Sequence, residues 1–196
     1  MNKAAFLDRD GVINQKAPIE GEYITRWEEL KILPGVAEAI ILLRRAGFQV
    51  IVVSNQRCVA KGLLAEAELD SMHRKLCDEL GALGATIDAV YYCPHDEEPP
   101  CSCRKPQPGM LFAAATERKI DLPSSWMIGD SEKDIEAGKR AGCRTTRIAQ
   151  NEANENVRAD VRASSLLEAA QVICRTDETT ADSPTPNASP VHVVRS

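Results

Sequence analysis

The sequence predicts an α/β fold, a doubly wound and mostly parallel sheet with helices on both faces. Short apolar runs typical of buried strands alternate with stretches whose apolar residues recur at helical spacing. The clearest apolar runs are Ala4–Leu7, Phe48–Val53 and Ile87–Tyr92. Strands that are apolar on both faces are typical of parallel sheets, in which helices form the crossover connections. This alternation continues along the chain and therefore predicts an open α/β sheet.

Two helices are expected between the first three strands. Val36–Ala46 has apolar residues at helical spacing, and Gly47 provides a stop signal at its end. Leu63–Leu83 is a longer helical pattern with one apolar stripe. His73 lies within that pattern, and we assign it no role because a single histidine on a helix is usually a surface or satisfied residue. Gln15–Leu33 is polar and is expected to be a long loop after the first strand.

The second half of the chain continues the alternation after a loop at Cys93–Pro108. Ser131 can cap the helix that it precedes, and Gly142 ends that helix. The expected elements are helices at Met110–Arg118, Glu132–Ala141 and Ser165–Cys174, and strands at Trp126–Ile128, Cys143–Ile148 and Asp160–Arg162. We expect one domain over residues 1–175. Residues 176–196 are rich in Pro, Ser and Thr, and we expect a disordered tail there.

The composition limits the possible partners. The chain has 196 residues, of which 43% are hydrophobic, enough to fill the core of one α/β domain. Its formal charge of −5 argues against nonspecific binding to nucleic acid, which relies on a basic face. No apolar run approaches transmembrane length, and the N-terminus has no signal-peptide pattern. We therefore expect a cytoplasmic protein without a membrane or nucleic-acid partner, and separately we expect a monomer.

Two carboxylates, Asp8 and Asp10, follow the first strand. Residues i and i+2 of an extended chain point to the same side, so both can reach one site, and Gly11 lets the backbone turn. An Asp-rich turn without function is the alternative. A buried carboxylate pair is costly unless a cation compensates it, and Mg²⁺ prefers oxygen ligands. The position at the carboxyl end of a strand favours a functional site with Mg²⁺.

Further polar groups follow other predicted strands: Ser54, Arg104-Lys105, and Asp130 with Asp134. Each alone has an ordinary explanation as a helix cap, a solvated loop residue or a turn. Together with Asp8 they supply carboxylates, a hydroxyl donor and a fixed positive charge. Phosphoryl transfer requires this equipment, because positioning and charge compensation provide most of its catalysis.

The ordered set Asp8-x-Asp10-Gly11, Ser54, Lys105 and Gly129-Asp130-x-x-x-Asp134 resembles the four motifs of haloacid dehalogenase superfamily phosphatases. The resemblance implies a cap-less, Rossmann-like core that uses Mg²⁺. It implies that Asp8 is the nucleophile and a metal ligand. Asp10 is then the general acid/base, and its backbone carbonyl binds the metal, which Asp130 completes. Ser54 and Lys105 hold the transferring phosphoryl group, whereas Asp134 orients its neighbours.

A second cluster of metal-type residues lies in the Cys93–Pro108 loop. Cys93, His95, Cys101 and Cys103 offer three thiolates and one imidazole, a set typical of structural Zn²⁺. The alternative is a coincidence of free thiols in a reducing compartment. The seven cysteines of the chain are an odd number, which argues against a disulfide framework. Because four protein ligands leave no position for substrate, we expect this Zn²⁺ to be structural.

The zinc loop and the run Arg104–Met110 resemble those of the heptose 1,7-bisphosphate 7-phosphatases, cap-less members that act in bacterial heptose synthesis. This implies a small phosphorylated sugar as substrate. The expected substrate-binding residues are Asn55, Gln56, Arg57, Arg104 and Ser131. Histidinol-phosphate phosphatases share the zinc loop and are the alternative, as is another small-molecule phosphatase. A noncatalytic, zinc-stabilised binding module is a hypothesis of a different class, against which the retention of both Asp8 and Asp10 speaks.

The sequence departs from the heptose-enzyme pattern at three places. Arg57-Cys58 stands where Ser-Gly is usual, and Ser131 stands where Lys is frequent. The loop Gln15–Tyr23 is also longer than usual. These positions are expected near the distal part of the substrate, so they bear on its identity more than on the chemistry. Arg57 could replace the missing lysine charge near a second phosphate.

Overall fold

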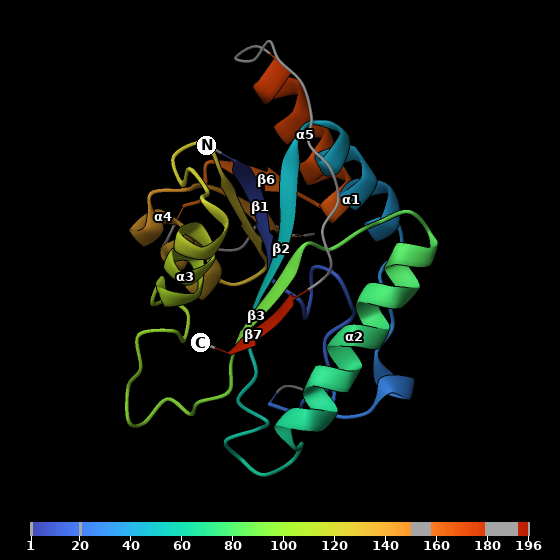
Figure 1. Cartoon of the computed structure of the whole chain (residues 1–196), viewed down its shortest axis with the longest axis vertical. Helices are drawn as coiled ribbons and strands as arrows, with labels where there is room; N and C mark the ends of the chain where they lie inside the picture. Colours follow the sequence, from blue (N-terminus) through green and yellow to red (C-terminus); the bar gives the residue numbers. More distant parts are fainter. Residues whose placement is uncertain (1, 20, 150–157, 179–191, 196) are drawn as a thin grey trace.

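A parallel sheet of seven strands, in the order β6-β5-β4-β1-β2-β3-β7, forms the centre of the molecule (Figure 1). The computed structural model describes residues 2–19, 21–149, 158–178 and 192–195. The strands are β1 (Lys3–Leu7), β2 (Phe48–Asn55), β3 (Ala89–Cys93), β4 (Trp126–Gly129), β5 (Arg144–Ile148), β6 (Val161–Ala163) and β7 (His192–Arg195). The prediction of a doubly wound parallel sheet is confirmed.

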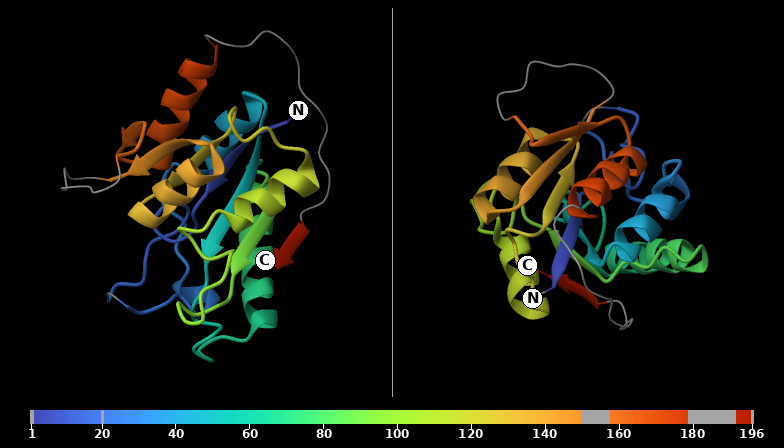
Figure 2. Two further views of the ribbon diagram at one scale, coloured as in Figure 1. Left: turned by 90° about the vertical axis from the view of Figure 1, so that its left-hand side faces the viewer. Right: turned by 90° about the horizontal axis from the view of Figure 1, so that it is seen from above.

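Helices cover both faces of this sheet (Figure 2). They are α1 (Val36–Arg45), α2 (Glu66–Ala82), α3 (Gly109–Arg118), α4 (Glu132–Ala141) and α5 (Leu166–Glu178), with a 3₁₀ turn η1 at Trp27–Glu29. Helices α1, α2 and α5 pack on one face in a cluster that includes Leu7, Val52 and Ile128. Helices α3 and α4 pack on the other face against Phe6 and Val53. Alternate residues of β1 and β2 thus serve two separate cores, which explains why these strands are apolar throughout.

The direction of strand order reverses at β1. The chain passes from β1 outward to β2 and β3, then returns to β4 on the other side of β1. Leu7, near the end of β1, lies opposite Val52 in β2 and Ile128 in β4. Polar residues that follow these three strands are therefore brought together. Ligands of open α/β sheets bind at this kind of switch point, outside the carboxyl ends of the strands.

Two long connections leave this carboxyl edge, from β1 to α1 and from β3 to α3. The first connection folds back so that its two ends lie side by side, where the Gln15 backbone N–H donates to the Lys31 carbonyl at 2.9 Å. The second contains the cysteine-rich loop. Neither connection contains an inserted domain within its described residues, as expected for a cap-less fold. No helix in the described part of the chain has the length and apolar character needed to cross a membrane.

The C-terminal region differs from the predicted tail at both of its ends. Helix α5 continues to Glu178, and His192–Arg195 forms β7, which pairs with β3. Without β7, strand β3 would present unpaired backbone groups at the edge of the sheet, and the two valines of this segment favour extended structure. This short strand was not predicted from the sequence, because the tail around it is rich in Pro, Ser and Thr. The remaining tail residues 179–191 and 196 lie outside the described residues, so disorder there stays a prediction.

Candidate active site

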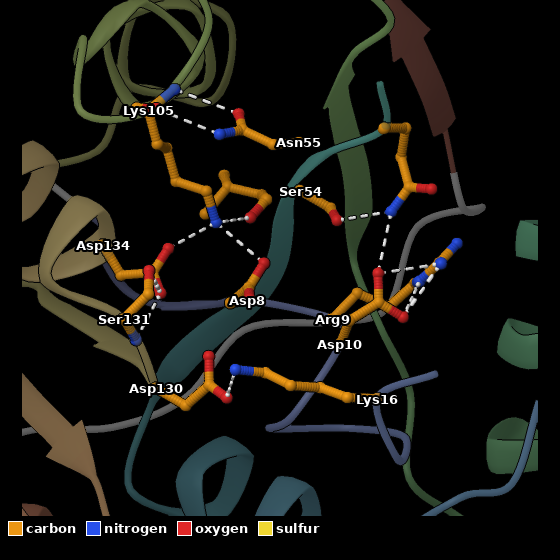
Figure 3. A network of polar contacts seen from close by, with 12 residues as sticks. Asp8, Arg9, Asp10, Lys16, Ser54, Asn55, Lys105, Asp130, Ser131 and Asp134 are labelled. Atoms are coloured by element: carbon orange, nitrogen blue, oxygen red, sulfur yellow. Dashed lines mark hydrogen bonds and ion pairs between the residues drawn. The ribbon is translucent and has the colours of Figure 1, made fainter. Parts of the chain in front are cut away.

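Three carboxylates gather at the switch point between β1 and β4 (Figure 3). Asp8 follows β1, Asp130 follows β4, and Asp134 lies in the first turn of α4. Their closest oxygens all lie within 4.8 Å of one another. Glycines make this approach possible, since a Cβ at Gly11 would lie 2.0 Å from Asp130 Oδ2. A Cβ at Gly129 would likewise meet the Asp134 side chain at 2.2 Å.

Lys105 provides the positive charge inside this cluster. Its Nζ lies 2.7 Å from Asp8 Oδ1 and 2.6 Å from Asp134 Oδ1, and it donates to the Val53 carbonyl at 2.7 Å. Burial opposes its charge, but the two carboxylates outweigh burial and raise the pKa of Lys105. The side chain is therefore a fixed cation, with its three ammonium protons all committed.

Asn55 holds the backbone from which Lys105 projects. Its amide accepts from the Lys105 N–H at 3.0 Å and donates to the Lys105 carbonyl at 3.0 Å. Both polar atoms of this side chain are thus used internally. The sequence predicts Asn55 as a substrate-binding residue, and that stays a prediction. The contacts that the structure shows for it are with the Lys105 backbone, because the cysteine-rich loop folds back over the end of β2.

The carboxylate cluster has more negative charge than its protein partners compensate. Burial raises the pKa of Asp8 to about 7, and the charge of Asp134 adds to this rise while Lys105 opposes it. Burial also raises the pKa of Asp130 despite its ion pair with Lys16, whose Nζ lies 2.6 Å away. Clustered oxygen ligands with unmet charge are the donor set that suits a hard cation such as Mg²⁺. The residues present therefore fit the metal that the sequence predicts.

Asp10 points away from that cluster and toward Arg9 (Figure 3). The Arg9 guanidinium donates from Nη2 to both Asp10 oxygens at 2.9 Å and from Nε to Oδ1 at 3.2 Å. Asn14 donates to Oδ1 at 2.8 Å, and Gln56 donates to Oδ2 at 3.1 Å. Burial opposes ionisation of Asp10, but Arg9 and these hydrogen bonds outweigh it and lower the pKa of Asp10.

Ser54 and Gln56 lie between the carboxylate cluster and the Asp10 side chain. The buried Gln56 amide donates to Ser54 Oγ at 2.8 Å as well as to Asp10. Ser131 is the N-cap residue of α4, and its backbone N–H and hydroxyl both donate to Asp134 Oδ2, at 3.0 and 2.6 Å. Gln56 and Ser131 were predicted to bind substrate. In the structure both side chains are engaged by neighbouring site residues, which the sequence alone could not reveal because their partners come from other elements.

The Cys93, His95, Cys101 and Cys103 side chains converge as predicted. The Cys93 Sγ lies 3.6 Å from Cys101 Sγ and 3.2 Å from Cys103 Sγ, and the Cys101–Cys103 distance is 3.4 Å. His95 Nδ1 lies 3.5 Å from Cys93 Sγ and 3.2 Å from Cys103 Sγ. Tetrahedral ligands about 2.0–2.3 Å from one Zn²⁺ lie about 3.5 Å apart. The spacing of these four atoms is therefore compatible with one bound zinc ion.

Charged residues surround Glu97 beside the same loop. The Glu97 carboxylate lies 3.4 Å from Arg104 Nη2, 3.3 Å from Lys133 Nζ and 3.9 Å from Arg57 Nη1. Arg57 also pairs with Asp96 through Nε at 2.6 Å. Arg104, Lys105, Lys133 and Glu97 line a pocket of about 230 Å³. The predicted residues Arg57 and Arg104 thus meet at one place, joined by Lys133 and Glu97, which the sequence analysis did not identify.

A larger pocket of about 540 Å³ lies on the other side of the carboxylates. It extends from Gly11 and Asp130 toward the ends of β5 and β6, where Ile148 and Leu166 line it. Lys16 is the cation among its lining residues. The carboxylate cluster therefore borders both a smaller pocket lined by three cations and a larger pocket lined by one.

The most consequential residues that the sequence analysis passed over are Arg9 and His73. Arg9 separates the two aspartates of the first motif, and its guanidinium is buried behind them. His73 is fully buried, and its Nε2 lies 3.1 Å from Arg9 Nη1. Helical spacing did place His73 on the apolar stripe of α2. No signal in the sequence linked that stripe to the strand end that bears Arg9.

Comparison with known proteins yields consistent matches. A family described as haloacid dehalogenase-like hydrolase matches residues 3–142, and a second, described as HAD-hydrolase-like, matches residues 102–196. The chain is 43% identical over 146 residues to D-glycero-beta-D-manno-heptose-1,7-bisphosphate 7-phosphatase of Rhodopseudomonas palustris, covering 71% of this chain and 79% of that protein. It is 36% identical over 165 residues to the protein of the same name from Pseudomonas putida, covering 84% and 93%.

A solved structure agrees with these matches. The crystal structure of D,D-heptose 1,7-bisphosphate phosphatase from B. bronchiseptica, complexed with magnesium and phosphate, superposes with a TM-score of 0.77 at 32% sequence identity. The match covers 89% of this chain and 99% of that chain.

Proposed function

The chain belongs to the haloacid dehalogenase-like hydrolases, and we propose that it is a Mg²⁺-dependent phosphatase of a heptose 1,7-bisphosphate. It is a phosphoric monoester hydrolase, and the bond cleaved is that of the 7-phosphate of D-glycero-D-manno-heptose 1,7-bisphosphate. The single observation that carries the proposal is the convergence of Asp8, Asp130 and Asp134 around Lys105 at the switch point, in a chain whose relatives bear this activity.

Asp8 is the nucleophile in this proposal. A carboxylate oxygen of Asp8 attacks the phosphorus, and the bond from phosphorus to the sugar oxygen breaks, which leaves an aspartyl phosphate. Lys105, 2.7 Å from Asp8 Oδ1, remains charged and compensates the transferring phosphoryl oxygens. Ser54 Oγ, which is held by Gln56, is a hydroxyl donor for the same group.

Asp10 transfers the protons. It donates a proton to the leaving sugar oxygen, then removes one from the water that hydrolyses the aspartyl phosphate. The Asp10 carboxyl is held ionised in the free site. The arriving phosphate brings negative charge next to it, which favours the protonated form that the first step needs.

Mg²⁺ fits the oxygens of Asp8 and Asp130, with the Asp10 backbone carbonyl as a further ligand. When bound, it compensates the charge of the phosphoryl group and of these carboxylates. Zn²⁺ fits the separate set of Cys93, His95, Cys101 and Cys103, which leaves no position for substrate. We assign it a structural role, in which it fixes the base of the loop that presents Arg104 and Lys105.

The 230 Å³ pocket supports a bisphosphate rather than a monophosphate substrate. It lies directly beside Lys105 and is lined by Arg104 and Lys133, which suits a second phosphate at the distal end of the substrate. Arg57 contributes a third positive charge at Glu97. Histidinol phosphate has no second phosphate and carries an ammonium group, which these cations would repel. The pocket therefore favours the heptose bisphosphate over this alternative.

A substrate panel tests the proposal. The α and β anomers of the heptose bisphosphate, histidinol phosphate and 4-nitrophenyl phosphate are compared by phosphate release with and without Mg²⁺. We expect the highest kcat/KM for one heptose bisphosphate anomer, and dependence on Mg²⁺ for every substrate. Preference for histidinol phosphate would contradict the substrate assignment. No phosphate release from any substrate would support a noncatalytic binding module.

A further inference from the structure

The buried pair Arg9–His73 lies behind the active site and is not required by the chemistry described so far. Arg9 is 1% exposed, and its guanidinium points into the protein between β1 and α2. Its Nε and Nη2 groups bind the Asp10 carboxylate as a planar fork. Such a fork fixes both the position and the plane of a carboxylate, which a single ammonium group cannot do.

His73 fixes the other end of the guanidinium. A guanidinium has only donors, so His73 Nε2, 3.1 Å from Arg9 Nη1, is the acceptor. The histidine is therefore neutral, and its ring proton is on Nδ1. Burial and the positive charge of Arg9 both disfavour protonation, and the pKa of His73 is lowered to about 3. The Tyr92 ring packs against the imidazole, with 5.4 Å between ring centroids.

A buried histidine at position 73 lowers the stability of the fold. The other buried residues on the same stripe of α2 are Leu69, Met72, Leu76, Cys77 and Leu80, all apolar. An apolar residue at position 73 would continue that stripe. His73 Nδ1 instead has no hydrogen-bond partner among the described residues, which costs stability for a buried donor. Packing therefore does not explain the histidine, whereas an acceptor for Arg9 does.

We propose that Arg9 and His73 are positioning residues for Asp10, which together hold its carboxyl in the orientation needed for proton transfer to the leaving oxygen. The inference rests on the acid/base role of Asp10 under the proposed function. Asp10 receives the fork of Arg9, Arg9 is held by His73, and His73 is fixed in the core of α2. Contacts thus connect α2 to the Asp10 carboxyl through His73 and Arg9, although His73 itself does not touch the substrate.

The experiment compares two substrates of similar size whose leaving oxygens differ in basicity, phenyl phosphate and 4-nitrophenyl phosphate. Phenolate is the poorer leaving group and needs a proton, whereas 4-nitrophenolate leaves readily without one. Loss of proton transfer therefore lowers kcat/KM more for phenyl phosphate, while loss of folded protein lowers both equally. Asp10→Asn provides the reference for complete loss, about 10²–10⁴-fold on the poorer leaving group.

His73→Leu removes the acceptor, and His73→Gln returns one, because a glutamine amide oxygen can take the place of Nε2. We expect His73→Leu to lower the phenyl/4-nitrophenyl ratio of kcat/KM by about 10-fold, chiefly through kcat, as a partial loss of acid catalysis. His73→Gln should recover the ratio of the wild-type protein. Arg9→Lys keeps the positive charge but loses the two-pronged contact with Asp10, so it should lower the ratio as His73→Leu does. If His73→Leu does not fold, Arg9→Lys tests the proposal in its place.

Each outcome separates this inference from the proposed function. If the wild-type protein hydrolyses neither substrate, the proposed function fails. If Asp10→Asn lowers both rates equally, the acid role of Asp10 fails. If Asp10→Asn behaves as expected but Arg9→Lys and His73→Leu leave the ratio unchanged, the positioning role of Arg9 and His73 is overturned.

Discussion

The carboxylate site and the cysteine-rich loop are two potential metal sites built in opposite ways. All ligands of the loop cluster lie between Cys93 and Cys103, and their spacing in the sequence already brings them together. The carboxylate cluster joins Asp8 to Asp130 and Asp134 across most of the chain. It also encloses its own cation, Lys105, with 3% exposure. The loop cluster contains no such cation among its four side chains.

The two sites therefore depend on different parts of the molecule. The loop cluster is local, so a metal could organise it without help from the sheet, and we expect the loop to depend on that metal because it has little core of its own. The carboxylate site depends on the whole sheet, since three strands must end at the same place. We therefore expect damage to the carboxylate site to remove chemistry while the fold remains, and damage to the loop to misplace Arg104 and Lys105.

The largest expected effect follows from Asp8→Asn. An amide is a very poor nucleophile and a weaker metal ligand, so we expect turnover to be abolished for every substrate. The measurement is phosphate release by the purified variant, with circular dichroism to confirm the fold. Asp78→Asn, an exposed carboxylate change on α2, is the matched control and should behave as wild type. Near-normal turnover by Asp8→Asn protein would refute the assignment.

The next effect concerns the loop cluster. Cys101→Ser should lower kcat/KM by about 10²-fold while most of the sheet stays folded, because displacement of Lys105 by about 1 Å is costly for the reaction. Cys101 is well suited as a thiolate ligand: burial raises its pKa, but hydrogen bonds, the largest from the Arg104 backbone, outweigh burial and lower it to about 7. Metal analysis should find stoichiometric zinc in the wild-type protein and less in the variant.

Cys77→Ser is the control for Cys101→Ser, since Cys77 is a buried thiol on α2 outside the cluster. It should retain zinc and activity, although it can lower stability. Wild-type protein that is fully active without zinc would contradict the organising role that we give to the metal.

A smaller effect is expected at the pocket of about 230 Å³ that Arg104 and Lys133 line, which lies where the two sites meet. Arg104→Ala and Lys133→Ala should each raise KM for the heptose bisphosphate by about 10-fold, the value of one charged hydrogen bond. They should change KM for 4-nitrophenyl phosphate much less, because that substrate has no distal phosphate. Glu97→Gln should lower KM for the bisphosphate, since the carboxylate competes for the same cations.

The control for these variants is Arg45→Ala, which removes an exposed arginine on α1 and should leave both KM values unchanged. Equal effects of Arg104→Ala on both substrates would show that Arg104 serves the reacting phosphate instead. That result would also remove the main argument for a bisphosphate.

Features formed by residues close together in the sequence were predictable, whereas contacts between distant segments were not. The convergence of Cys93, His95, Cys101 and Cys103 was predictable, because their spacing in the sequence brings them into one loop, and the zinc ion itself stays a prediction. The strands and helices were predictable from periodicity, and the motif aspartates from their position after strands. The positioning contacts of Asn55, Gln56 and Ser131 were not, because their partners lie on other elements. Strand β7 was missed because a four-residue strand within a Pro- and Ser-rich tail has no periodicity to detect.

The last expected effect concerns stability rather than rate: a pH dependence that comes from the buried side of the carboxylate site. His73 has a folded pKa of about 3, below its ordinary value of 6.5, so the unfolded chain binds an extra proton between these values. Stability is therefore unaffected by this group above about pH 6.5 and falls by up to about 1.4 kcal/mol per pH unit below it. His73→Gln removes this dependence, so its free energy of unfolding should fall less steeply with acid.

Zinc release complicates this measurement, because acid also protonates thiolate ligands. Urea unfolding between about pH 7 and pH 5 is therefore compared in the Cys101→Ser background, with and without His73→Gln. We expect the two curves to diverge by about 2 kcal/mol at the acid end, because only the protein with His73 must exclude a proton. Parallel curves would mean that His73 is not held neutral by Arg9. The acid sensitivity of both proteins would then come from groups other than His73.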